Sequence, residues 1–287
     1  MNEEREYLLD RWANPKSYVE GVRNFEFAFS SQCNLTCKYC GKHNDSSEDY
    51  ELSYEDLTSL IDRIMLNRVA PITFMICGGE PFLHEDLFKS VYTYAMETYG
   101  SLILNFSVRT NLTLLPGSLL AFLKAAPKIL IQTSLYGSES CNEERVFAAD
   151  ASPSFATVVE NIEIFLTECG PSRLSVSVAL DLDNVEQLPA TVEFLYSLGV
   201  RNIFLDLRDT KVIKDMFKLK IQEVSSFVVQ HQDLGINLFK RLASLEEVGP
   251  FTELDGEIIL HPSPPKPLTP FYELREFAYN FHQQALA

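Results

Sequence analysis

Three cysteines lie within eight positions of the sequence, in the segment CNLTCKYC at 33–40. Cys33, Cys37 and Cys40 are clustered densely enough to indicate metal binding or catalysis if the thiols stay reduced. A structural zinc site takes four protein ligands, and His43 is available to complete a Cys3His set. Alternatively, the three thiolates hold an iron–sulfur cluster and leave one iron open to another ligand. The spacing alone leaves both interpretations open.

The charge and hydropathy of the chain restrict its partners. Its 287 residues include 24 Lys and Arg against 40 Asp and Glu, a formal net charge of −16. Nucleic-acid-binding proteins gather cations along the phosphates, so this excess of acid argues against RNA or DNA. No apolar run approaches the roughly eighteen residues of a membrane-spanning helix. The acidic opening segment MNEEREYLLDRW is unlike a signal or transit peptide. We expect a cytoplasmic protein with no membrane partner.

Short β-rich apolar segments alternate with helical patterns from residue 25 onward. The predicted strands are 25–29, 72–77, 102–108, 129–134, 173–180 and 202–207. The predicted helices are about 53–67, 84–98, 117–125, 154–168 and 185–198. Two of these helices are expected to begin at capping serines, Ser53 (with Asp56 three positions later) and Ser154.

Six strand–helix repeats imply parallel pairing with right-handed crossovers. The predicted fold class is α/β, a partial (β/α)6 TIM-like barrel of parallel strands with a short C-terminal α/β extension. A flat doubly wound sheet fits the pattern almost as well. After about residue 210 we expect a further helix, two short strands joined by a turn at Asp255 and Gly256, and a closing helix. The predicted parts are an N-terminal extension, 1–22, a core, 23–210, and a C-terminal extension, 211–287.

Three further motifs follow predicted strands. CGGEPFL at 77–83 follows the second, RTNLTLL at 109–115 follows the third, and TSLYG at 133–137 ends the fourth, with Arg145 eleven residues after Ser134. Because the carboxyl ends of parallel strands meet at one edge of the sheet, these segments and the cysteine segment are expected at the same edge.

In this order and context, the four segments resemble the radical S-adenosylmethionine (radical SAM) superfamily over about residues 23–208. The resemblance implies that Cys33, Cys37 and Cys40 hold a [4Fe–4S] cluster whose open iron binds S-adenosylmethionine (SAM). It also implies an external one-electron reductant of the flavodoxin or ferredoxin type. Cleavage of SAM would then yield a 5'-deoxyadenosyl radical that takes a hydrogen atom from a substrate carbon.

The resemblance also assigns residues to SAM. Tyr39 would lie by the adenine, Glu80 would accept a hydrogen bond from the methionine ammonium, and Ser134 and Arg145 would help to hold the ribose and carboxylate. The implied cofactor residues are Tyr39, Gly78, Gly79, Glu80, Pro81, Asn111, Ser134 and Arg145.

The motifs are most similar to the SPASM/twitch peptide-modifying branch of that family, with departures. Tyr136 stands in place of an aspartate common in that branch, and Leu112 in place of a common glycine. No cysteine follows Cys169, and His261 stands where the branch's C-terminal extension would carry one. We therefore expect a degenerate extension without auxiliary clusters, which favours redox-neutral outcomes such as epimerisation or rearrangement. Cross-linking of the substrate is a further reaction considered.

Further candidates depend on position at strand ends. Cys141 and Cys77 are candidate hydrogen donors to a substrate radical, since a thiol is the usual donor. The candidate substrate residues are Arg109, Tyr136, Asp181, Asp206 and Arg208.

The leading prediction is a radical SAM enzyme acting on a peptide or a small natural-product precursor. The alternatives are an aminosugar or nucleoside epimerase or dehydrogenase, an activase that installs a glycyl radical on a partner enzyme, and a Cys3His zinc interaction module that is not an enzyme.

Overall fold

The computed structural model describes residues 24–38, 40, 50–66, 68, 71–207, 213–238, 251–254 and 257–260. Its main feature is a nine-stranded sheet of order β1-β3-β4-β5-β7-β8-β9-β11-β10, in which the first seven strands are parallel and the last two antiparallel. The first and last strands in this order do not pair with each other, so the described sheet is open. The parallel strands are β1 (Asn24–Ala28), β3 (Ile72–Cys77), β4 (Ile103–Arg109), β5 (Ile129–Ser134), β7 (Leu174–Leu180), β8 (Asn202–Leu207) and β9 (Gly235–Leu238).

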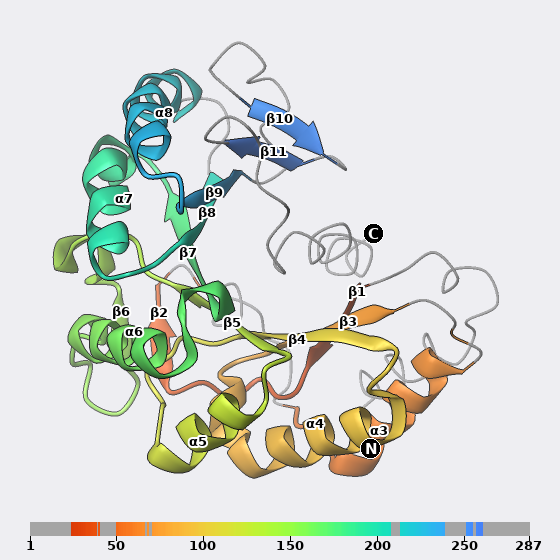
Figure 1. Cartoon of the computed structure of the whole chain (residues 1–287). Coiled ribbons are helices and arrows are strands. Elements are labelled where there is room, and N and C mark those ends of the chain that lie inside the picture. Colours follow the sequence, from red (N-terminus) through yellow and green to blue (C-terminus); the bar gives the residue numbers. More distant parts are fainter. Residues whose placement is uncertain are drawn as a thin grey trace, which may run out of the picture.

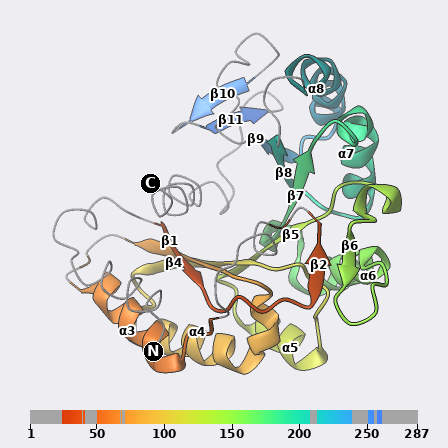
Figure 2. The same ribbon diagram turned by 180° about the vertical axis from the view of Figure 1, so that it is seen from behind.

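Helices cover the convex side of this curved sheet, as Figures 1 and 2 show from opposite directions. They are α3 (Tyr54–Met65), α4 (Glu85–Tyr99), α5 (Gly117–Ala125), α6 (Phe155–Cys169), α7 (Leu188–Ser197) and α8 (Ile213–Gln230). Each crossover returns to a parallel strand, so the α/β class and the partial-barrel arrangement are confirmed.

The two faces of the sheet differ in chemistry. Side chains on one face, such as Phe74, Phe106 and Val176, join the hydrophobic core under the helices. Residues that alternate with them, such as Glu26, Ser107 and Gln132, lie outside that core on the opposite face. We call this second, concave side the inner face. The buried apolar surface therefore holds the scaffold together on one side and leaves polar groups on the other.

The structure adds three strands that were not predicted. β2 (Leu35–Cys37) and β6 (Arg145–Phe147) form a separate two-stranded antiparallel sheet. They were missed because three-residue strands carry too little alternation to be detected. β9, a seventh parallel strand, follows α8. Two short strands predicted near 251–260 are present as β10 (Phe251–Leu254) and β11 (Glu257–Leu260). The turn residues and the expected closing helix lie outside the described residues.

One predicted helix cap is confirmed and the other is wrong. Ser53 and Asp56 form a reciprocal capping box at the start of α3. Ser154 precedes α6 but makes no capping bond; its hydroxyl donates instead to the backbone oxygen of Arg145 at 2.8 Å. In the part of the chain that the structure describes, no helix has the length and apolar character needed to cross a bilayer.

Candidate functional site

The three clustered cysteines lie in one loop at the carboxyl end of β1. Cys33 precedes β2, Cys37 ends it, and the Cys40 backbone nitrogen donates to the Cys37 oxygen at 2.9 Å. All three are half-buried and none forms a disulfide. Pairing of β2 with β6 places Cys37 opposite Arg145. The two-stranded sheet thus fixes the backbone position of the second cysteine.

The Gly78–Gly79 pair holds the start of this loop. Gly79 donates its N–H to Ser30 O, and Glu80 donates to Gln32 O, both at 2.8 Å. A Cβ atom on Gly79 would lie 1.7 Å from Gln32 O, and one on Gly78 would lie 2.5 Å from Ser30 O. The glycines were expected to let the backbone approach a ligand. In the structure their lack of a side chain lets two backbone segments pack together.

Glu80 is the most buried carboxylate near the loop, with 1% of its surface exposed. Its Oε1 accepts from the Thr110 hydroxyl at 2.7 Å and the Phe82 N–H at 3.0 Å, and its Oε2 accepts from the Asn111 N–H at 2.7 Å. A carboxylate has about four lone-pair sites, so Oε2 can accept one more donor. Pro81, the next residue, begins a short 3-10 helix (Pro81–His84) and is buried.

Burial dominates the ionisation of two groups at the site. Desolvation raises the pKa of Glu80, against the three hydrogen bonds and the more distant Arg145, which lower it. Desolvation also raises the pKa of the Cys33 thiol, opposed mainly by the Leu35 N–H. Both groups would become anions more readily beside a cation, because a positive charge offsets the cost of burial.

Asn111 connects the cysteine loop to the end of β4. Its side-chain nitrogen donates to Asn34 Oδ1 at 2.9 Å and lies 3.8 Å from Cys33 Sγ. Its side-chain oxygen accepts from the Thr113 N–H at 2.9 Å and hydroxyl at 2.7 Å, and Asn34 donates to the same hydroxyl at 2.8 Å. Leu112, between them, has a φ of 57° and is fully buried. This positive φ explains why glycine would suit the position.

Arg145 and Ser134 are in contact. The buried Arg145 guanidinium donates to the Ser134 backbone oxygen and lies over the Tyr136 ring, 5.5 Å from its centre. No carboxylate of the described residues lies within ion-pair distance of Arg145, although Glu80 is near enough to interact electrostatically. Tyr136 is buried, and its N–H donates to Asn142 Oδ1 at 3.1 Å.

Cys77 and Arg109 both form a hydrogen bond with Glu26 on the inner face. Cys77 Sγ donates to Glu26 Oε1 at 3.0 Å, and Arg109 Nη1 donates to Glu26 Oε2 at 3.4 Å. Arg109 Nε donates to Gln132 Oε1 at 3.1 Å. These four side chains therefore form a row across β1, β3, β4 and β5.

The remaining candidates lie elsewhere or outside the described residues. Cys141 is in a short 3-10 helix (Glu139–Asn142), where its thiol donates to Gln187 at 3.1 Å; none of its recorded contacts is with a predicted cofactor residue. Asp181 accepts the N–H groups of residues 183 and 184 and so closes a turn before α7. Asp206 is half-buried on the inner face of β8. Tyr39 and Arg208, like His43, lie outside the described residues.

Three thiols in one loop form a donor set suited to zinc or to an iron–sulfur cluster. In the described ranges, no three His, Cys, Asp or Glu side chains are arranged to hold a single metal ion. A [4Fe–4S] cluster makes a different demand, because each thiolate binds a different iron. Three cysteine thiols are donors that such a cluster takes, so the residues present fit it.

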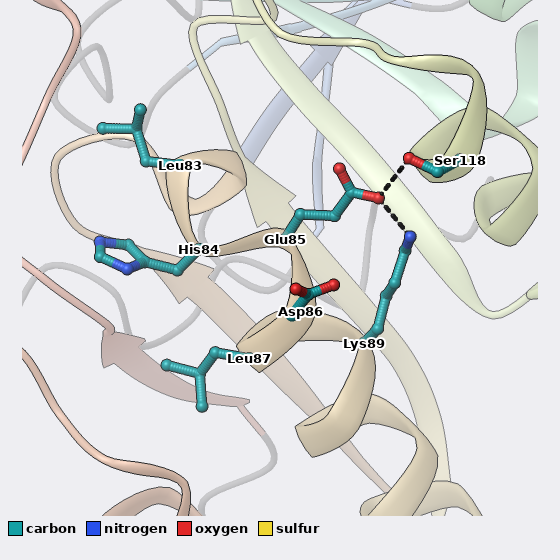
Figure 3. Close-up of a pocket in the computed structure, with 7 residues that line it drawn as sticks. All are labelled: Leu83, His84, Glu85, Asp86, Leu87, Lys89 and Ser118. Atoms are coloured by element: carbon teal, nitrogen blue, oxygen red, sulfur yellow. Dashed lines mark hydrogen bonds and ion pairs between the residues drawn. The ribbon is translucent and has the colours of Figure 1, made fainter.

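Surface hollows are found away from this loop. Figure 3 shows one at the start of α4, where the Glu85 carboxylate accepts a hydrogen bond from Ser118 at 2.8 Å and pairs with Lys89. A second lies between Tyr54, Tyr94 and their neighbours on α3 and α4. Neither is lined by a cysteine or by any predicted site residue.

Several site residues were not predicted. Asn34, Thr110 and Thr113 support the loop, and Glu26 and Gln132 belong to the inner-face row. Asn34 and Thr110 lie inside or next to the quoted motifs, so their hydrogen-bonding groups were a usable signal. Glu26 alternates with phenylalanines in FEFAF, which places it on the face away from the core.

An open parallel sheet with three free thiols in a loop at its carboxyl edge defines an α/β protein with a candidate metal-binding loop. The sequence-family model of the Radical SAM superfamily matches residues 27–195, more than half of the chain. The chain belongs to the Radical SAM superfamily, whose enzymes use a [4Fe–4S] cluster and SAM.

The chain also has sequence relatives of known name. The chain is 24% identical over 193 residues to an uncharacterized protein of Methanocaldococcus jannaschii, covering 67% of this chain and 65% of that one. It is 26% identical over 199 residues to a probable GTP 3',8-cyclase of Saccharolobus islandicus, covering 69% of this chain and 59% of the relative. The chain thus spans less than two thirds of these relatives' length.

Solved structures share the fold at low identity. One is anSMEcpe with bound AdoMet and a Cp18Cys peptide, with a TM-score of 0.62 and 18% identity over 72% of this chain and 60% of that one. Another is Streptococcus suis SuiB bound to its precursor peptide SuiA, with a TM-score of 0.62 and 14% identity over 88% of this chain and 55% of that one. At this level of identity the likeness shows a shared fold.

Proposed function

We propose that this protein binds a [4Fe–4S] cluster through Cys33, Cys37 and Cys40, binds SAM beside it, and abstracts a hydrogen atom from a carbon of a peptide or small natural-product substrate. The observation that carries this proposal is Glu80, a buried carboxylate whose Oε2 has one accepting position left. Asn111 joins that carboxylate to Cys33 through its backbone and side chain. When bound, the cluster and SAM supply a 5'-deoxyadenosyl radical.

The chain's own residues bind and orient the cofactor in this proposal. Glu80 accepts a hydrogen bond from the methionine ammonium, whose charge offsets the carboxylate's burial. Arg145, buried beside Ser134, binds the methionine carboxylate, and Ser134 binds the ribose. Tyr39 lies by the adenine. The backbone from Gly78 to Pro81 and the side chain of Asn111 complete the cofactor residues.

The residues proposed to contact the substrate are Arg109, Tyr136, Asp181, Asp206 and Arg208. Of the two proposed hydrogen donors, Cys77 is the better supported, because it lies on the inner face next to Gly78 and its thiol is bonded to Glu26. Cys141 contacts Gln187 instead.

A peptide substrate is supported by two structural neighbours, which were solved with peptides bound. A nucleoside or nucleotide substrate is the second candidate, because several sequence relatives are probable GTP 3',8-cyclases. We further propose a cytoplasmic role in natural-product biosynthesis, with a flavodoxin or ferredoxin as the reductant. The proposed parts of the chain are an N-terminal extension, 1–22, a core, 23–210, and a cysteine-free, SPASM/twitch-like extension, 211–287.

Anaerobic reconstitution with iron and sulfide tests the proposal. We expect about four irons per chain, visible cluster absorption, and release of 5'-deoxyadenosine from SAM under dithionite. Cys33→Ala, Cys37→Ala and Cys40→Ala should each lose all three properties, whereas Cys169→Ala should keep them, since Cys169 ends α6 away from the loop. One tightly bound zinc with no SAM cleavage would support the zinc module instead.

A further inference from the structure

The inner face carries a patch of hydrogen-bond donors that the cofactor site does not use. Arg109 ends β4 and Gln132 is its neighbour on β5. The Arg109 side chain is 37% exposed, and two of its five N–H donors are used, one by Gln132 and one by Glu26. The other three have no partner among the described residues.

Gln132 adds donors of its own. Its Oε1 accepts from Arg109 Nε, so its amide nitrogen must point away from the guanidinium with both N–H groups available. The amide orientation follows from this contact, since the reverse orientation would oppose two donors. Arg109 and Gln132 together present a set made only of donors. Such a set suits an acceptor group on a ligand.

Two buried hydroxyls next to this pair also lack partners. Ser107 lies two residues before Arg109 on the inner face of β4, and Ser175 is the neighbour of Gln132 on β7. Their exposed fractions are 1% and 0%, and neither hydroxyl has a hydrogen bond in the structure. Buried hydroxyls without partners are costly in a packed core. Both add hydrogen-bonding capacity to the inner face beside Arg109, and Thr133 on the core-facing side of β5 is unpaired as well.

The charge around Arg109 favours a carboxylate over a phosphate as the acceptor group of the ligand. Among the residues of β1 to β9 on the inner face, the charged groups are Arg109, Glu26 and Asp206. Glu26 Oε2 lies 3.4 Å from Arg109 and already neutralises part of its charge. A phosphate dianion would need further cations here, whereas a carboxylate needs one guanidinium and matches its planar fork.

We propose that Arg109 and Gln132 form a carboxylate-binding subsite on the inner face of the sheet, and that the substrate of this enzyme carries a carboxylate that binds there. Glu26 orients the guanidinium and competes for it electrostatically. This inference rests on the proposed function and narrows its substrate class to acids, such as a peptide with an acidic side chain or a free C-terminus.

Small probes can test the subsite on the full chain loaded with cluster and SAM. We would titrate N-acetylphenylalanine, its amide and phenyl phosphate by anaerobic calorimetry. We expect the acid to bind at least tenfold more tightly than the amide, and more tightly than the phosphate. Arg109→Gln should remove the preference for the acid, and Gln132→Leu should reduce it severalfold.

Two further variants separate binding from folding. Glu26→Gln should strengthen acid binding, because it removes a competing negative charge; a damaged fold would not produce this gain. Arg63→Gln, an exposed change on α3, should keep the wild-type preference. The subsite is rejected if the acid does not bind, binds no better than the amide or phosphate, or keeps its preference in Arg109→Gln.

The cofactor carboxylate is the competing occupant. A loss of SAM affinity in Arg109→Gln that accompanies the loss of acid binding would assign Arg109 to SAM and overturn the subsite. SAM cleavage by the wild type tests the proposed function separately. Cleavage without an acid preference rejects the subsite alone, whereas absence of both cluster and cleavage rejects the proposed function.

Discussion

Glu80 combines full burial with three hydrogen bonds from the chain. The donors hold the carboxylate in place before any ligand arrives, and burial raises its pKa by more than they lower it. A cationic ligand reverses this balance, because the charged carboxylate then has a partner. The residue that orders the protein's backbone at this site is thus also the one best prepared for an ammonium group.

This balance gives a pH prediction for the protein without cofactors. Above pH 4.5, folded Glu80 still binds a proton that the unfolded chain has lost, so its contribution to the free energy of unfolding falls as pH rises through the raised pKa. The slope is at most about 1.4 kcal/mol per pH unit. Glu80→Gln cannot titrate. Urea unfolding gives the free energy of unfolding of both proteins, and the difference, wild type minus variant, should decrease as pH rises. An increase of this difference with pH would mean that Glu80 is charged at low pH.

Leu112 gives a second prediction, from its backbone conformation. Its φ of 57° strains any residue with a Cβ, while its side chain is fully buried. Leu112→Ala should lose about 2–5 kcal/mol of stability and keep the strain. Leu112→Gly loses similar packing but relieves about 1–2 kcal/mol of strain.

The glycine variant at 112 should therefore be the more stable of the two by about 1 kcal/mol. This order is the reverse of the one expected at a negative φ. Chemical unfolding of the two variants checks it, and an alanine variant more stable than the glycine variant would show that the position is not strained.

At the scale of elements, the cysteine loop is ordered by its neighbours and not by its own sequence. β6 pairs with β2, and the backbone of residues 78–80 packs on residues 30–32. The loop's position thus depends on segments some fifty and more than one hundred residues away. This arrangement explains why a change remote from the thiols can alter metal binding.

Gly79 tests this dependence. Gly79→Ala would place a Cβ 1.7 Å from Gln32 O, so the loop must shift. We expect loss of most iron after reconstitution and destabilisation by about 1–3 kcal/mol. Gly117→Ala is the matched control, because a Cβ at the start of α5 meets nothing within 4 Å. The control should bind iron normally and gain about 0.5–1 kcal/mol. Equal iron in both variants would refute the packing argument.

The same elements show what could be predicted from the sequence. The six long strands and their helices have strong periodic patterns, so their bounds were predicted to within about three residues. Side-chain partners were not predictable in the same way. Ser154 was expected to cap a helix, yet it bonds the Arg145 backbone, because β6 brings that oxygen within reach. The sequence motifs gave the position of the candidate site. The row of side chains on the inner face could be identified only once the pairing register of the strands was known.

At the scale of the whole molecule, charge is the dominant property. A net charge of −16 favours solubility and repels other acidic proteins at long range. The proposed reductant must nevertheless approach the cysteine loop closely enough to transfer an electron. Near the loop, the exposed Lys38 is paired with Glu144, so this cation is already neutralised.

This charge predicts how electron transfer depends on salt. With an acidic flavodoxin as donor, the second-order rate of cluster reduction should rise between low ionic strength and about 0.15 M salt, because screening shortens the range of repulsion to about 8 Å. Stopped-flow absorbance of the cluster measures this rate. Reduction by dithionite in the same salt series corrects for effects on the cluster itself. A rate that falls with salt would instead require a local basic surface on this protein that attracts the donor, and the overall charge would then not control the encounter.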